Sequence, residues 1–324
     1  GGTLRGLRHQ ASDRPAFMMS AALFFEQLLN GLQFGVMLFL MAAGLTLVFG
    51  VMGLINLAHG SLYMVGAFAC ASVVAATGSF TLGLVASFVA AAFAGVVVEG
   101  LVLRRLYRRD HLDQVIVTFA LILVFTEGTR WLFGSYPLYL DIPSALQGTV
   151  HLPGGIDYPL FRLMIILVGL LVAALLFLAV NRTRLGVRIR AGEADREMIA
   201  ALGIDISKLY MVVFALGAAL AGFAGALVGS VQSVQVGMGE PVLILGFVVI
   251  VIGGIGSIGG ALIAAILVGI TDTMGRVFLP MAFAAFTDPA SANATGSALA
   301  SMLIYILMAL VLVFRPSGLF GEKA

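Results

Sequence analysis

Residues 28–50 read LLNGLQFGVMLFLMAAGLTLVFG and contain no charged side chain. A helix that crosses the hydrocarbon core of a membrane needs about 20 consecutive apolar residues, so this run is long enough to span one. It lacks the strict alternation of apolar and polar residues that is typical of membrane β-barrel strands. The stretch therefore predicts a transmembrane helix.

Eight further apolar stretches follow this one along the chain. Together they predict an all-α polytopic membrane protein with about eight or nine transmembrane helices. The second and seventh of the nine stretches are short, which is typical of re-entrant or broken helices. The eight are Ser61–Thr77, Phe80–Leu103, Gln114–Phe133, Phe161–Val180, Leu209–Ser230, Val242–Ile252, Ala261–Phe278 and Ala298–Phe314.

The composition of the whole chain supports this class. Of its 324 residues, 61% are hydrophobic and only 10% are charged, and the mean hydropathy is +1.10. Soluble domains have roughly 45–50% apolar and about 25% charged residues, which excludes a soluble enzyme. A disordered chain would need low hydrophobicity, and the net charge of +2 argues against nucleic-acid binding. The single cysteine, Cys70, excludes a disulfide framework.

The distribution of charge predicts which loops lie in the cytoplasm. Basic residues gather in Arg104–Asp113, in Arg182–Lys208 and from Arg315 to the end, whereas residues 135–161 contain no Lys or Arg. Because basic loops tend to stay in the cytoplasm, the first three segments are predicted to lie inside and residues 135–161 outside. Counting crossings backwards places the N-terminus outside.

The same pattern predicts the domain organisation. Residues 1–17 form a polar tail without an apolar core, and we interpret them as a tag remnant or an upstream start rather than a signal peptide. Residues 18–324 form a single transmembrane domain, with a cytoplasmic loop over residues 181–208.

Two glycine-rich segments interrupt the apolar runs. They are GVMGLINLAHGS, Gly50–Ser61, and GGIGSIGG, Gly253–Gly260. Broken helices with unwound backbone often line a transport pathway, because freed N–H and C=O groups can face a polar passage there. An alternative is that Asn56 and His59 only satisfy the loose backbone or mark a helix end. The predicted pathway residues are Asn56, His59, Ser61, Tyr63, Gly256 and Ser257.

Ionisable groups within apolar stretches are costly to bury and are functional candidates by default. Glu127 and Arg130 lie three residues apart on one helix face, and we interpret them as a structural ion pair. Glu99 lies near Arg104 and is predicted to reach the inner membrane surface.

The cytoplasmic loop contains a helical pattern over Ala191–Leu202. Apolar residues recur there among charged ones, which predicts a short amphipathic helix outside the membrane that ends at Gly203. Such a helix is suited to docking a partner protein. The alternative is a solvated loop that faces lipid headgroups. The apolar residues are Ile189, Ala194, Met198 and Leu202.

Four stretches in the same order give the chain a family resemblance. They are GLTLVFGVMGLINLAHGSLYMVGAF (Gly44–Phe68), TRLGVRIRAGEADREMIAALGI (Thr183–Ile204), VVIVIGGIGSIGGALIAAILVG (Val248–Gly269) and FRPSGLFG (Phe314–Gly321). The chain resembles the LivH-like permeases of branched-chain amino-acid-type ABC importers. This resemblance implies an ABC importer permease fold in the bacterial inner membrane.

The resemblance also implies what the cytoplasmic loop does. In that family it is similar to the coupling loop whose short helix docks on an ATPase. The wider pattern has Glu-Ala-Ala followed by a nearby Gly, whereas here Asp195 follows Glu193-Ala194 and the Gly comes later. The implied coupling residues are Arg190, Ala191, Glu193, Ala201 and Gly203.

The implied function is uptake of a small polar solute, by family default branched-chain amino acids, powered by ATP. The implied partners are a LivM-like second permease, two ABC ATPase subunits and a periplasmic substrate-binding protein. The sequence agrees that the motor is elsewhere, because a phosphate-binding loop ends in Gly-Lys-Ser/Thr and the two lysines, Lys208 and Lys323, follow Ser207 and Glu322. We expect no enzymatic activity, no metal and no cofactor in this chain, and ATP on the partner subunits.

Two other classes remain as alternatives. A secondary transporter or channel would need no ATPase but would need charged coupling groups at mid-membrane, where Glu127 and Arg130 are the main candidates. An intramembrane serine hydrolase is disfavoured, because Ser257 has Ile255 two positions before it and forms no G-x-S-x-G turn.

Overall fold

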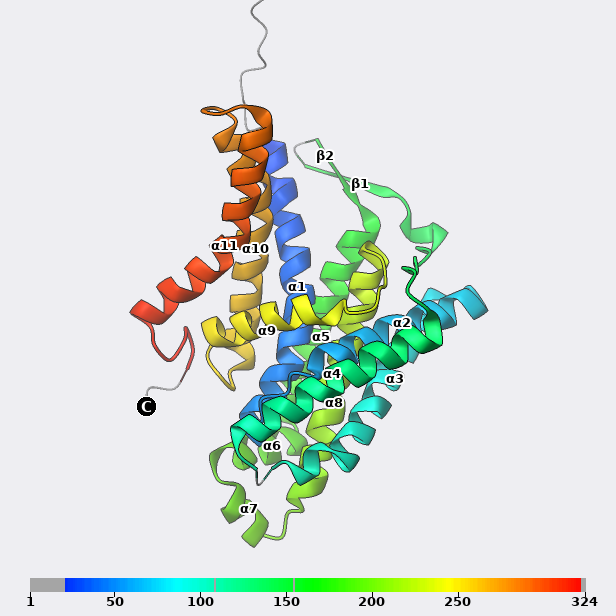
Figure 1. Ribbon diagram of the computed structural model, residues 1–324, viewed down its shortest axis with the longest axis vertical. Helices are drawn as coiled ribbons and strands as arrows, with labels where there is room; N and C mark the ends of the chain where they lie inside the picture. The colour runs from blue at the N-terminus through cyan, green and yellow to red at the C-terminus, as the bar shows by residue number, and fades with distance from the viewer. Residues whose placement is uncertain (1–20, 108, 154, 322–324) are drawn as a thin grey trace, which may run out of the picture.

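The computed structural model describes residues 21–107, 109–153 and 155–321 as a helical protein (Figure 1). All nine predicted apolar stretches are helical, and eight of these helices are long and apolar enough to cross a membrane. They are α1 (Ala21–Met52), α2 (His59–Thr77), α3 (Phe80–Leu101), α4 (His111–Phe133), α5 (Leu160–Arg182), α8 (Ile206–Val231), α10 (Ile258–Phe283) and α11 (Pro289–Phe314). The chain is therefore a multi-pass membrane protein. The ninth stretch forms the shorter helix α9 (Gly239–Gly253).

Short elements connect the long helices. A hairpin of β1 (Thr149–Leu152) and β2 (Ile156–Pro159) precedes α5, and its antiparallel register pairs Thr149 with Pro159. Two 3₁₀ turns, η1 (Leu103–Arg105) and η2 (Ser144–Leu146), lie in the loops around α4. The predicted tail over residues 1–17 lies outside the described residues.

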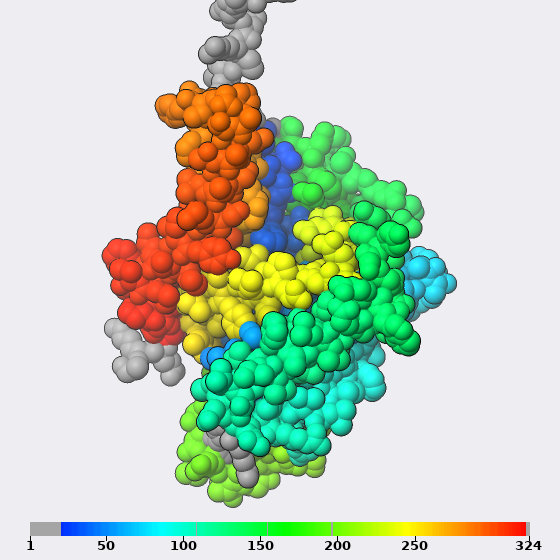
Figure 2. Space-filling model, in the orientation of Figure 1, coloured from blue at the N-terminus to red at the C-terminus, as the bar shows by residue number. Residues whose placement is uncertain are grey.

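Helices α1 and α8 form the centre of the protein. Most of α1 is buried from Val36 to Val48, whereas α4 and α11 expose most of their side chains. Figure 2 shows α4 and α11 on the visible surface. Their exposed apolar side chains suit contact with lipid or with another membrane subunit.

Glycines permit the close approach of the central helices. A methyl group added at Gly31 or Gly35 of α1 would lie 2.7 Å from the Cα of Ile270 or Ile266 in α10, respectively. At Gly66 of α2 it would collide with the backbone of Gly222 in α8. In a membrane the hydrophobic effect does not drive helices together, because lipid tails are as apolar as the side chains. Helices associate instead through close van der Waals packing, which small residues such as glycine permit.

The two ends of the protein differ as the charge pattern predicts. The β1–β2 hairpin and the α10–α11 turn lie at one end, while the short helices α6 (Arg184–Ala194) and α7 (Arg196–Ala201) lie at the other (Figure 1). The C-terminal tail folds onto the link between α9 and α10, where the Leu319 N–H donates to the Ile252 carbonyl at 2.8 Å. Helix α6 also lies at this link. The basic loop over residues 182–208 and the C-terminal segment from Arg315 therefore lie on the same side of the protein.

Two sequence predictions are wrong in detail. The helix expected over residues 191–202 is broken, because the Asp195 side chain accepts the N–H groups of Glu197 at 3.0 Å and Met198 at 2.9 Å and so begins α7 as a separate helix. Glu99 does not extend outward from the protein as predicted. It is fully buried and accepts a 2.8 Å hydrogen bond from the Tyr107 hydroxyl.

Candidate functional site

The first helix break lies between Met52, where α1 ends, and His59, where α2 begins. Asn56 shapes it, because its side-chain oxygen accepts the Ala58 N–H at 3.1 Å. This is the backbone-satisfying role that the alternative interpretation gave to Asn56. The amide nitrogen of the same side chain is buried and reaches no hydrogen-bond partner in the described part of the chain.

The other predicted pathway residues of this break are buried at helix contacts. His59 lies against Gly44 of α1, where a methyl group would come within 3.0 Å of its Nε2 atom. Tyr63 packs on Gly225 of α8, and Ser61 is 5% exposed. All four polar residues are therefore buried, with His59 against α1 and Tyr63 against α8.

The second helix break lies between α9 and α10, over residues 254–257. Gly254 and Gly256 have φ angles of 97° and 81°, which favour glycine. The Ser257 hydroxyl accepts the Gly260 N–H at 3.0 Å and caps α10. Both breaks that the glycine-rich sequence predicts are thus present.

Helix α6 is fixed to the end of α5. The Thr183 hydroxyl accepts the Gly186 N–H at 3.2 Å and caps α6. The Arg190 guanidinium donates to the carbonyl of Val180, which lies in the last turn of α5. Ile189 is buried, at 3% exposure. Any force on α6 therefore reaches α5 through these contacts.

Helix α7 forms the tip of the loop. Gly203 ends it as predicted, with φ at 82° and its N–H bonded to the Ala200 carbonyl at 3.0 Å. The predicted single apolar stripe is wrong, because Ile189 faces inward whereas Met198 and Leu202 are 58% and 74% exposed. Those two side chains form an apolar patch at the tip, which we call the tip patch.

Asp205 begins α8 immediately after the tip. Its carboxylate accepts the Lys208 N–H at 3.1 Å, and this hydrogen bond lowers the pKa of the carboxyl group. The charged form is thus favoured at neutral pH, where it caps α8.

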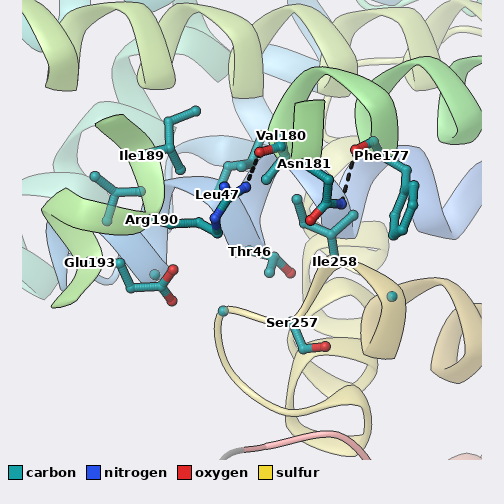
Figure 3. A pocket seen from close by; sticks show the side chains of 14 residues that line it. Thr46, Leu47, Phe177, Val180, Asn181, Ile189, Arg190, Glu193, Ser257 and Ile258 are labelled. Atoms are coloured by element: carbon teal, nitrogen blue, oxygen red, sulfur yellow. Dashed lines mark hydrogen bonds between the residues drawn. The ribbon is translucent and has the colours of Figure 1, made fainter. Parts of the chain in front are cut away.

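Residues from the last turns of α1, from the end of α5, from α6 and from the second helix break meet at one cavity of about 320 Å³ (Figure 3). Glu193 of α6 lies between the end of α1 and the second break: a methyl group at Gly50 would be 3.0 Å from its Oε1, and one at Gly256 would collide with it. The cavity is bordered by Thr46, Leu47, Gly50, Val51, Phe177, Val180, Asn181, Ile189, Arg190, Glu193, Gly256, Ser257, Ile258 and Gly259.

This cavity joins two predicted pathway residues, Gly256 and Ser257, with two predicted coupling residues, Arg190 and Glu193. The remaining predicted residues lie elsewhere, those of the first break in the core and Ala191, Ala201 and Gly203 on other parts of the loop. Thr46 and Asn181 are not among the residues predicted from the sequence. Thr46 carried a usable signal, since it is a polar residue in a stretch of α1 that is otherwise apolar.

Other charged groups form pairs. Glu127 and Arg130 bond at 2.6 Å on the exposed face of α4, with side chains about half exposed or more. This is the structural ion pair that the sequence predicts. In the described residues, no group of three or more His, Cys, Asp or Glu side chains is placed to hold a metal ion.

Comparisons with known proteins give a consistent result. Residues 27–312 match the family model described as "Branched-chain amino acid transport system / permease component". The chain is 30% identical over 313 residues to the high-affinity branched-chain amino acid transport system permease protein BraD of Pseudomonas aeruginosa, across 92% of this chain and 96% of that protein.

Two further relatives have related names. The high-affinity branched-chain amino acid transport system permease protein LivH of Escherichia coli is 27% identical, across 92% of this chain and 96% of its own length. A probable branched-chain amino acid transport permease protein LivH of Methanocaldococcus jannaschii is 29% identical, across 88% and 89%. No solved structure matches the chain significantly.

Proposed function

We propose that this chain, which belongs to the branched-chain amino acid transport system permease family and is a permease subunit of an ABC importer, carries branched-chain amino acids into the cytoplasm across a bacterial inner membrane. The family membership supports the transport role, and the names of the relatives support the substrate class. Residues 18–324 act in this proposal as one transmembrane domain.

The position of Glu193 is the observation that carries the mechanism, because Glu193 borders one hollow with Gly53 of the first break and lies against Gly256 of the second. Because α6 is bonded to the end of α5 and touches Gly50 and Gly256, a displacement of α6 acts on three membrane helices at once. Helix breaks are where a membrane helix bends most easily. Movement of α6 thus changes the angle between the segments on either side of each break.

The force on α6 comes from partner subunits. The tip patch of Met198 and Leu202 projects from the end of the protein that carries the basic loops, which suits docking into an apolar cleft of an ATPase. The complete importer then contains a LivM-like second permease, two ABC ATPases that bind ATP, and a periplasmic substrate-binding protein. This chain contributes the passage and the coupling loop, without a cofactor of its own.

Affinity purification of the tagged chain from its native membrane in mild detergent tests this proposal. We expect mass spectrometry to identify a P-loop ATPase and a second permease among the proteins that co-purify. Repeated recovery of the chain alone would contradict the importer assignment and would favour a secondary transporter or channel.

A double variant of the tip patch sharpens the same experiment. Met198→Ser with Leu202→Ser should greatly reduce recovery of the ATPase, because it removes the exposed apolar side chains of α7. Phe286→Ser is the matched control, since Phe286 is 87% exposed in the α10–α11 turn at the opposite end. Equal ATPase recovery from both variants would place the docking surface elsewhere.

A further inference from the structure

The cavity beside α6 is lined by charged, polar and apolar side chains, and a role as part of the transport passage does not explain this combination. Its volume of about 320 Å³ is at the lower end of small-molecule sites, which span about 300–1,000 Å³. It lies where α1, α5, α6 and the α9–α10 link meet (Figure 3), on the predicted cytoplasmic side. A solute that binds there is therefore expected to enter from the cytoplasm.

One part of its lining carries opposite charges. Arg190 and Glu193 both border the cavity from α6. The guanidinium of Arg190 has five N–H donors, and its bond to the Val180 carbonyl uses one of them. A ligand carboxylate can therefore be bound by Arg190 while a ligand ammonium lies beside the Glu193 carboxylate.

A buried hydroxyl adds a second, independent observation. Thr46 is 1% exposed and borders the cavity, and its Oγ1 atom has no hydrogen-bond partner in the described residues. A buried hydroxyl without a partner costs free energy, and a ligand that places a polar atom against Oγ1 supplies the missing hydrogen bond. Ser257 and Asn181 contribute further polar atoms to the same lining.

The remaining lining is apolar. Besides Gly50, Gly256 and Gly259, it consists of Leu47, Val51, Phe177, Val180, Ile189 and Ile258. These side chains suit a branched aliphatic group, because burial of such a group releases apolar surface from water.

We propose that this cavity is a cytoplasmic-side binding site for a zwitterionic amino acid with a branched apolar side chain. Its carboxylate binds Arg190, its ammonium lies beside Glu193, and its side chain packs on the apolar lining. The assignment of branched-chain amino acids rests on the proposed function, whereas the zwitterion chemistry rests on the lining residues.

A ligand in this position links parts that must move during transport. It contacts α1 and the α9–α10 link on one side and α6 on the other. It thereby holds α6 against the end of α1 and against the second helix break. Amino acid that accumulates in the cytoplasm is thus expected to slow further uptake, which is inhibition of the importer by its own product.

Direct binding tests the site without transport. Tritiated leucine is added to the purified importer complex in lipid nanodiscs, without ATP and without the binding protein. We expect saturable binding that is weakened at least about tenfold by Arg190→Gln and several-fold by Thr46→Val. Thr46→Val preserves the side-chain shape, so it keeps the test valid if Arg190→Gln folds poorly. Arg188→Gln is the matched control, because Arg188 lies on α6 but borders a different hollow.

Ligand analogues test the zwitterion chemistry. Leucinamide lacks the carboxylate and 4-methylpentanoate lacks the ammonium, so each should compete at least about tenfold less well than leucine. Three results would overturn the proposal. They are the absence of saturable leucine binding, leucine binding by Arg190→Gln and Thr46→Val that is as tight as in the wild type, and competition by both analogues that is as strong as that of leucine.

Lipid composition separates a free amino acid from a lipid headgroup of similar chemistry. Phosphatidylethanolamine also carries an ammonium and an acidic group, so binding is compared in nanodiscs with and without it. Leucine binding that is the same in both supports the amino-acid assignment. Leucine binding that disappears when this lipid is present would assign the cavity to the headgroup instead.

Uptake into proteoliposomes tests the regulatory consequence. The complete importer, with binding protein and ATP, is measured with and without leucine trapped on the ATPase side. Trapped leucine should lower the wild-type rate, and Thr46→Val should reduce this inhibition relative to its own rate without trapped leucine. Equal fractional inhibition of both proteins would contradict the role of the cavity. Failure to transport any branched-chain amino acid would refute the proposed function instead. The binding assay would still test the cavity, because it does not depend on transport.

Discussion

The two helix breaks have similar glycine-rich sequences but lie in different surroundings. At the first break, Asn56 and His59 are fully buried, and His59 lies against Gly44 of α1. At the second, Gly256 and Ser257 border the cavity beside Glu193. The difference shows that the sequence of a break predicts unwound backbone, whereas the neighbouring helices determine which way its polar groups face.

Packing explains the difference. Helix α2 follows the first break and contacts α9 and α8 closely, because Gly60 touches the backbone of Gly239 and Gly66 that of Gly222. The second break is instead bordered by α6 and by the C-terminal tail, whose Phe320 N–H donates to the Gly253 carbonyl at 3.1 Å. The first break is thus a packed core element, and the second is a contact point for elements outside the membrane.

The largest expected effect compares one glycine after each break. Gly60 and Gly259 are both the second residue of the following helix. A methyl group at Gly60 would lie 2.6 Å from the Gly239 carbonyl oxygen, whereas one at Gly259 meets nothing within 4 Å. Gly60→Ala should therefore destabilise the protein by about 1–3 kcal/mol or more, and Gly259→Ala should stabilise it by up to about 1 kcal/mol. Thermal unfolding in detergent measures both, and equal stability of the two variants would remove the distinction between the breaks.

A somewhat smaller effect is expected at Asn56. Asn56→Ala removes the acceptor of the buried Ala58 N–H, which should cost about 1–3 kcal/mol. Asn181→Ala is the matched control, because the Asn181 amide bonds to the Phe177 carbonyl on an exposed part of α5. Far-UV circular dichroism during heating gives the Tm of each variant. A Tm loss for Asn181→Ala as large as for Asn56→Ala would show that burial of the first break does not matter.

The smallest expected effect concerns the cap at the second break. Ser257→Ala removes the acceptor of the Gly260 N–H at a partly exposed position, so about 1 kcal/mol should be lost. Ser257→Asp keeps a capping oxygen and should retain most of the stability. If Ser257→Ala lowers the Tm more than Asn56→Ala does, the second break is the more tightly packed of the two.

Much of the fold follows from the sequence because lipid imposes simple rules. Each apolar run of sufficient length became a helix, and the glycine-rich interruptions became breaks at residues 53–58 and 254–257. Gly203 ended α7 because glycine adopts its positive φ without strain. These features depend on residues that are close together in the chain.

Features that depend on tertiary contacts could not be predicted in the same way. Glu99 is buried because Tyr107, beyond a 3₁₀ turn, donates to it, and nothing in the local sequence reveals that pairing. Likewise, Glu193 meets Gly50 and Gly256, which lie far from it along the chain. The cavity and its lining residue Thr46 exist only because α1, α6 and the α9–α10 link come together.

The number of amino acids taken up per ATP hydrolysed is the most direct test of the central claim that α6 acts on both breaks through Glu193. Proteoliposomes with the complete importer are compared for wild type, Glu193→Ala and Asp113→Ala, an exposed carboxylate at the start of α4. Glu193→Ala should lower this ratio at least about fivefold, the low end of a coupling free energy of ~1–3 kcal/mol, while Asp113→Ala leaves it unchanged. If Glu193→Ala takes up as many amino acids per ATP hydrolysed as the wild type, the claim that α6 acts through Glu193 is contradicted.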